Sequence, residues 1–220
     1  MKKSFLFIIT LILLGGFLAS CSADRGFVSN VTRDDIKQMA QFEMYAHFGP
    51  VEYEISIIDN DSVTSIDNDS VTSIAKSLFE TELAQDKTLP VTESIAISDN
   101  LVRNKVQDEI RWLRIYIDNN NVSVKDITIP PTIDSILCSR NVRFGLLVHN
   151  GGFYCPDGIY KSPSSGIPVA HEGSTRSAIF IVDSELKNLA YVATAWCNSS
   201  PLKAETYRKQ VKDLLKKYKK

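Results

Sequence analysis

The feature that most constrains the fold is a pair of apolar segments near the C-terminal end of the chain. Residues 177–183 and 189–196 consist largely of apolar residues, and the polar residues 184–188 separate them. Two apolar segments joined by a short polar turn are typical of an antiparallel β-hairpin. A hairpin placed late in the chain favours an α+β fold over a repeated βαβ fold with parallel strands.

Other strands and helices are predicted from the spacing of apolar residues. Strands are expected at residues 51–57, 91–97 and 142–148, with a short edge strand at 127–129. Helices are expected at residues 33–47, from Asp69 or Ser70 onward, from Asp99 or Asn100 to about 118, at 130–138, and after Pro201. We therefore expect one α+β domain over residues 32–220, in which amphipathic helices pack on a mostly antiparallel sheet.

The predicted helices differ in the signals that support them. Thr32 and Asp35 form a capping-box pattern, and Gly49-Pro50 would end the helix that follows. The helix after Asn100 has the clearest apolar stripe, formed by Val102, Val106, Ile110, Leu113 and Ile117. In the helix after Asp69, the residues expected to face inward are Val71, Ile74, Ala75 and Leu78. In the last helix they are Tyr207, Val211, Leu214, Leu215 and Tyr218.

An exact eight-residue duplication interrupts the domain, because residues 58–65 recur unchanged as residues 66–73. Two short copies are too few for a solenoid. The Asp-x-Asp pattern lacks the glycine and the distal glutamate of an EF-hand. We interpret the duplication as a lengthened surface loop whose second copy caps the following helix.

The N-terminal residues have the parts of a bacterial export signal. Lys2 and Lys3 give a positive start, and residues 5–17 are almost wholly apolar. This stretch is shorter than the roughly 20 apolar residues that a membrane-spanning helix needs, so it is interpreted as a cleavable signal. Residues 18–21, Leu-Ala-Ser-Cys, resemble the lipobox of bacterial lipoproteins. The resemblance implies that residues 1–20 are removed and that Cys21 carries acyl chains such as palmitate.

The expected partner of Cys21 is a lipid bilayer, because several acyl chains hold a protein stably where one holds it only marginally. Ser22 occupies a position where an inner-membrane retention signal often carries aspartate, which favours the outer membrane. Residues 21–31 are small and polar and are expected to form a lipidated tether. The sequence leaves open whether the domain faces the periplasm or the outside.

The charge balance excludes one class of partner. The chain has 25 basic and 26 acidic residues, and loss of Lys2 and Lys3 with the signal leaves a formal charge of −3. No basic stripe with interleaved aromatic residues is present. Nucleic acid is therefore not an expected partner.

Three cysteines remain after Cys21 is committed to lipid, and they lie in an oxidising compartment where disulfides persist. None of them forms a Cys-x-x-Cys pair, so no zinc pattern is present. If strand 142–148 is followed by the hairpin, Cys155 and Cys197 meet at one end of the sheet. We expect these two to form a disulfide, and Cys138 to be a small buried apolar residue.

The densest cluster of chemically capable residues surrounds a glycine- and proline-rich loop expected over residues 150–175. It contains His149, Asp157, His171 and Glu172. These residue types serve as metal ligands or acid–base groups, and Cys155 beside a histidine could be a nucleophile. Their spacing matches no known ligand set or family signature. We therefore assign no metal, cofactor or catalytic residue.

The block from Arg143 to Tyr218 combines a strand, a glycine-rich loop, a hairpin containing Ile-Val-Asp and a terminal amphipathic helix. It resembles uncharacterised lipoproteins of gut Bacteroidetes. Its outline is also similar to small α+β envelope lipoproteins that act as accessory factors for secretion or cell-wall synthesis. The resemblance implies a non-enzymatic accessory or binding module with an envelope protein partner. The alternative is a small exported hydrolase, or a thiol or metal enzyme, that uses residues 149–172.

Overall fold

The computed structural model describes residues 22–24, 26–28, 31–50, 68–119, 126–155, 159–161, 168–170 and 172–219. Within these residues seven strands form one sheet in the order β1-β9-β8-β5-β2-β4, with β3 also paired to β5. The strands are β1 (Ser22–Asp24), β2 (Met39–Phe42), β3 (Tyr45–Pro50), β4 (Val91–Ile95), β5 (Phe144–Tyr154), β8 (Gly173–Asp183) and β9 (Asn188–Cys197). The short strands β6 (Ile159–Lys161) and β7 (Pro168–Ala170) pair only with each other.

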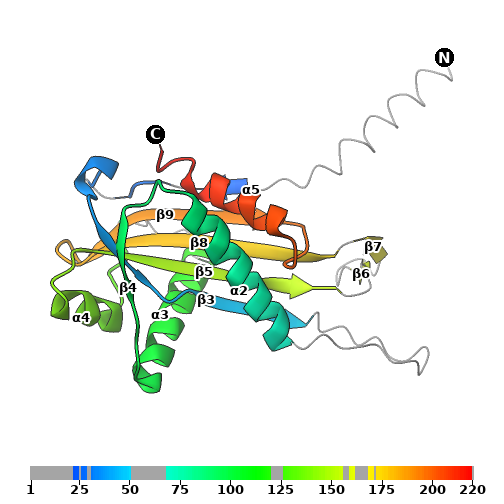
Figure 1. Ribbon diagram of the computed structural model, residues 1–220, viewed down its shortest axis with the longest axis horizontal. Helices are drawn as coiled ribbons and strands as arrows, with labels where there is room; N and C mark the ends of the chain where they lie inside the picture. Colours follow the sequence, from blue (N-terminus) through cyan, green and yellow to red (C-terminus); the bar gives the residue numbers. More distant parts are fainter. Residues whose placement is uncertain are drawn as a thin grey trace, which may run out of the picture.

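Helices cover both faces of the sheet and enclose two apolar cores (Figure 1). The helices are α2 (Asn68–Gln85), α3 (Asn100–Asn119), α4 (Pro131–Ser139) and α5 (Ala204–Leu215). Helices α2 and α5 pack on one face, where Phe79, Tyr191 and Tyr207 are fully buried. Helices α3 and α4 pack on the other face, around side chains such as Ile110 and Phe180.

The predicted fold class is confirmed, because the chain is one α+β domain whose longest strand pairings are antiparallel. Strands β8 and β9 form the predicted hairpin, and β5 pairs antiparallel with β8 along its whole length. The part that was not predicted is parallel: β2 pairs with β4, and both β2 and β3 pair with β5. The sheet is therefore mixed, with its parallel part on the β4 side.

The predicted helix over residues 33–47 is wrong. The capping box forms, since the Asp35 carboxylate accepts hydrogen bonds from the Thr32 amide (2.8 Å) and hydroxyl (2.7 Å). The helix ends after one 3-10 turn, Arg33–Asp35, and the chain continues as β2 and β3. Both faces of β2 are buried, since Met39 lies in one core and Phe42 in the other, whereas in β3 Phe48 is buried and His47 is exposed. A strand buried on both faces lacks the polar–apolar alternation that identifies a strand in a sequence.

Helices α2 and α3 confirm two predicted helices, with one correction. The Asp99 carboxylate caps α3 by accepting from the amides of Leu101 (2.8 Å) and Val102 (3.1 Å). The predicted α3 stripe is buried from Val106 to Ile117, and Val102 is half-buried. In α2 the buried stripe runs through Val71, Ala75, Phe79 and Leu83, at intervals of four. Ile74 was expected to face inward, but 45% of its surface is exposed because it lies beside this stripe.

Helices α4 and α5 also match the sequence: four of the five residues expected on the last inner face are buried in α5, and Tyr218 is buried just after its end. The expectation for Cys138 is wrong, because this thiol is exposed near the C-terminal end of α4. Cys138 follows the buried Leu137 by one residue. Because each residue of an α-helix is rotated by about 100° from the one before, the Cys138 side chain points away from the core. The Nζ of Lys187 lies 3.4 Å from its sulfur.

Three further predictions concern segments whose bounds differ in the structure or lie outside the described residues. The loop expected at 150–175 is shorter, because β5 continues to Tyr154 and β8 begins at Gly173. The edge strand expected at 127–129 is a single bridge from Thr128 to Asn188. The strand expected at 51–57, the first copy of the duplication and Cys21 lie outside the described residues.

Part of the segment expected as a lipidated tether, residues 21–31, packs on the sheet where the structure describes it. Ser22 to Asp24 pair with β9 as strand β1, and Phe27 forms a bridge with Tyr191. The Phe27 ring also contacts the rings of Tyr191 and Tyr218, with centroids 5.1 and 5.4 Å away. Without β1, the outer backbone groups of β9 would be unpaired at the sheet edge.

Candidate functional site

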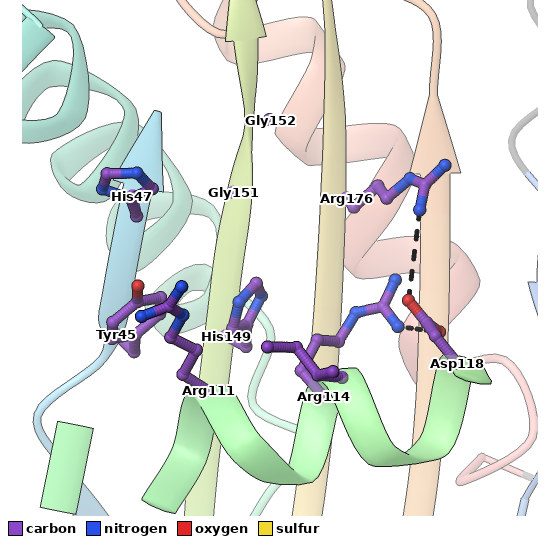
Figure 2. Close-up of a pocket in the computed structure, with 10 residues that line it drawn as sticks. Tyr45, His47, Arg111, Arg114, Asp118, His149, Gly151, Gly152 and Arg176 are labelled. Carbon is purple, nitrogen blue, oxygen red and sulfur yellow. Dashed lines mark ion pairs between the residues drawn. The ribbon is translucent and has the colours of Figure 1, made fainter. Parts of the chain in front are cut away.

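A cavity of about 230 Å³ lies between α3 and the sheet, over β3, β5 and β8. We call it the α3 pocket. The residues that line it are Tyr45, His47, Arg111, Arg114, Ile115, Asp118, His149, Gly151, Gly152 and Arg176. Figure 2 shows three neighbouring strands forming its floor and α3 crossing beside them.

Strand register places the floor residues in rows. His47 is opposite Gly151, and Gly151 is opposite Arg176 on its other side. Tyr45 is opposite His149 in the next row, two residues along each strand. Because alternate side chains point to the same face of a sheet, all of these residues face α3.

Gly151 creates the hollow in the middle of this floor. It separates the side chains of His47 and Arg176 with backbone alone (Figure 2). A Cβ at this position would lie 2.9 Å from the carbonyl oxygen of His47 and 3.2 Å from Cε1 of His149. At Gly152, where φ is +155°, a Cβ would meet the Ser174 carbonyl oxygen at 1.9 Å. Both positions therefore require glycine for the strands to approach as they do.

The α3 side of the pocket is strongly cationic. Arg111 and Arg114 are three residues apart on α3, so they lie on neighbouring parts of one helix face. Arg114 is 7% exposed and forms an ion pair with Asp118 one turn further on. Nη1 of Arg176 lies 4.0 Å from the same carboxylate. Asp118 is the one carboxylate among the lining residues, which include three arginines.

His149 is held neutral within this setting. Its ring stacks on Tyr45, with centroids 5.1 Å apart and planes at 25°. Burial lowers the pKa of His149 to about 3, and the positive charge of Arg114 acts in the same direction. A neutral imidazole can donate one hydrogen bond and accept another. At neutral pH it therefore offers a polar group to the pocket without adding charge.

These groups suit anion binding better than proton transfer. Arginine does not release a proton in proteins, and the Asp118 carboxylate is engaged by Arg114 and Arg176. His149 would have to titrate near neutral pH to be an effective general acid, whereas its pKa is about 3.

Of the four residues that the sequence grouped as one functional loop, the structure describes two and places them apart. His149 lies in the α3 pocket, whereas Glu172 is exposed and forms an ion pair with Lys203. The amide of Cys155 donates to the Glu172 carbonyl (3.1 Å), so these two residues share the far end of β5 and β8. Six residues of extended chain put Cys155 roughly 20 Å from His149. Asp157 and His171 lie outside the described residues.

The expected disulfide between Cys155 and Cys197 is not formed. The two thiols are buried at the same end of the sheet, as the topology predicted, and Cys197 is paired with Thr175 of β8. Strand β8 lies between β5 and β9, which puts the backbones of the outer two strands roughly 10 Å apart. A disulfide needs Cα atoms within about 7 Å.

The described residues contain neither a metal-binding cluster nor a membrane-spanning helix. No cluster of three or more His, Cys, Asp or Glu side chains has the geometry to hold a metal ion. None of the helices within the described ranges combines the length and apolar character needed to cross a membrane.

The sequence identified one pocket residue, His149, and missed the cations around it. Arg111 and Arg114 have a recognisable signal, since they flank the apolar stripe of the clearest helix. Tyr45 and His47 could not be found, because their segment was predicted to be helical. Arg176 joins the site only through the register of β8 on β5.

Comparison with known proteins identifies no family: no protein-family model matches the chain, and no curated protein matches it. Among solved structures, two crystal forms of the PelC dodecamer from Paraburkholderia phytofirmans are similar in outline. One, a point variant, has a TM-score of 0.35 and 11% identity, covering 91% of this chain and 98% of that chain. The other has a TM-score of 0.34 and 11% identity, covering 90% and 97%. A match at this level assigns no function.

Proposed function

We propose that this protein is a lipid-anchored lipoprotein of the cell envelope, held in the outer membrane by acyl chains on Cys21. Its domain acts as a non-enzymatic accessory or binding module for an envelope partner. The observation that carries the binding role is the α3 pocket, whose lining includes three arginines and a single carboxylate. The anchor is supported by the export signal and the lipobox-like residues 18–21.

The α3 pocket is built on regular elements, which suits precise binding. Its floor is built on three paired strands, and its wall on a helix whose stripe is buried. Sites built on strands and helices hold their groups more precisely than sites on loops. The enzymatic alternative loses its His149 version, since His149 is roughly 20 Å from Cys155 and from Glu172 along the strands; the version that uses His171 or Asp157 falls outside the described residues.

Strand β1 begins at the residue that follows the proposed anchor in the sequence. Ser22 is opposite Trp196 on β9. The lipid would therefore join the domain at the β9 edge rather than through a long spacer. That edge would rest close to the bilayer, leaving α3 free on the opposite part of the molecule (Figure 1).

In-cell cross-linking followed by affinity purification tests this proposal. Four forms are compared: the natural protein, Cys21→Ala, Arg176→Gln and Arg140→Gln. Arg176 and Arg140 are both exposed arginines, but only Arg176 lines the pocket. We expect defined envelope partners with the natural protein and with Arg140→Gln, and their loss with Arg176→Gln and with Cys21→Ala.

Two results would overturn the proposal. Equal recovery with Arg176→Gln would remove the pocket from the binding role. Equal recovery with Cys21→Ala would show that the anchor is not needed.

A further inference from the structure

We propose that the α3 pocket binds the phosphate group of an anionic ligand. This inference deepens the proposed binding role and rests on it, because it names the chemistry that the pocket would recognise. Phosphate is available from two sources, a lipid headgroup or a soluble phosphate ester, and both present the same group to the protein.

The first argument is charge. The three guanidinium groups and the Asp118 carboxylate together leave two positive charges around the cavity. The charge of the largely buried Arg114 is balanced by its ion pair with Asp118, so the excess is carried by Arg111 and Arg176. A phosphate monoester carries between one and two negative charges at neutral pH, which matches this excess.

The second argument is the arrangement of the donors. Arg111 rises from α3 between Tyr45 and His149, and Arg176 approaches from the opposite side of Gly151 (Figure 2). Both side chains are exposed, so an incoming group can reach them from solvent. Guanidinium groups bind phosphate oxygens through paired hydrogen bonds. The neutral imidazole of His149 and the exposed imidazole of His47 can each donate an N–H hydrogen bond to a remaining phosphate oxygen.

The third argument is the role of Asp118. Its carboxylate lies between Arg114 and Arg176 (Figure 2) and forms ion pairs with both guanidinium groups. It therefore keeps two guanidinium groups in position while the cavity above Gly151 stays open. A bound phosphate would share Arg176 with Asp118 and would take Arg111 for itself.

The test uses the acylated full-length mature protein in detergent, labelled with ¹⁵N-histidine. The precursor chain contains three histidines, so the imidazole spectrum is simple, and His149→Gln identifies the key signal. Inorganic phosphate is added at constant ionic strength, with sodium chloride as the reference. We expect saturable shifts of the His149 and His47 signals with phosphate but not with chloride.

The matched variants are Arg111→Gln with Arg176→Gln, against Arg140→Gln. We expect the double variant to bind phosphate at least about tenfold more weakly, and the control to bind like the natural protein. A thermal melt confirms that each variant is folded. Absence of saturable shifts, or equal affinity in the double variant, would overturn the proposal.

Vesicles then distinguish the two sources of phosphate. Phosphatidic acid in phosphatidylcholine vesicles should shift the same signals if the source is a headgroup, and pure phosphatidylcholine should not. A soluble sugar phosphate that shifts them where the vesicles do not assigns a soluble ester. Failure of the phosphate titration rejects this inference alone, whereas failure of the cross-linking comparison rejects the binding module even if phosphate binds.

Discussion

At the scale of single residues, the environment of His149 decides what the α3 pocket can do. Its imidazole is stacked on Tyr45 and surrounded by arginines, and its pKa is lowered to about 3. In the unfolded chain the same group titrates near pH 6.5. Between pH 6.5 and 3 the imidazole is protonated in the unfolded state and neutral in the folded state. Lowering the pH therefore favours unfolding.

The free energy of unfolding should therefore fall as the pH decreases from about 6.5 towards 3. One proton contributes up to about 1.4 kcal/mol per pH unit. Between pH 7.5 and 5 we expect the natural protein to lose about 2 kcal/mol more than His149→Gln, measured by urea unfolding. Equal losses in the two proteins would show that His149 is protonated in the folded state.

Gly151 offers a second test at the same scale. Alanine at this position would place a methyl group 2.9 Å from the His47 carbonyl oxygen, on the pocket floor. We expect Gly151→Ala to destabilise the domain by about 1–3 kcal/mol and to weaken phosphate binding. Gly49→Ala is the matched control, since nothing lies within 4 Å of its added Cβ. Comparable stability of the two variants in urea would argue against a tightly packed floor.

At the scale of elements, the predictable parts were those with one buried face or a strong local signal. Helices α3 and α5 have clean apolar stripes, and the β8–β9 hairpin has a polar turn between apolar segments. Strand β2 has neither, because it is buried on both faces between two cores, and β3 is a short strand with one face in the α3 pocket. Their pairing with β5 depends on residues about 100 positions away, which no local pattern records. The α3 pocket was missed for the same reason.

Helix α2 gives the element-scale prediction. Phe79 is fully buried in the core under α2, whereas Ile74, five residues earlier, is 45% exposed. We expect Phe79→Ala to lower the free energy of unfolding by about 3–5 kcal/mol. Ile74→Ala should change it by less than about 1 kcal/mol. Chemical denaturation of both variants measures the two changes in unfolding free energy. Similar losses in the two variants would show that the Phe79 face of α2 is not the one that packs in the core.

At the scale of the whole molecule, β1 pairs with β9 at one edge of the sheet, whereas α3 packs over β3 and β5. The α3 pocket extends towards that edge, because Ser22 is opposite Trp196 and Trp196 is opposite Arg176. A domain anchored at Cys21 would rest on this edge, with Arg176 two strands away from it and α3 beyond.

The two tryptophans can report this orientation. Trp196 is opposite Ser22, beside the anchor, whereas Trp112 is on α3. In vesicles containing brominated lipids, the fluorescence of Trp112→Phe, which retains Trp196, should be quenched. The fluorescence of Trp196→Phe, which retains Trp112, should be much less affected. The reverse pattern would place α3 at the membrane.

The claim of a lipid-anchored binding module depends first on the anchor itself. The most direct measurement is the mass of the N-terminal peptide of the protein extracted from the membrane fraction of its native cells. We expect a peptide that begins at Cys21, lacks residues 1–20 and carries the mass of several acyl chains. A peptide that begins at Met1, or one that begins at an unmodified Cys21, would contradict the claim.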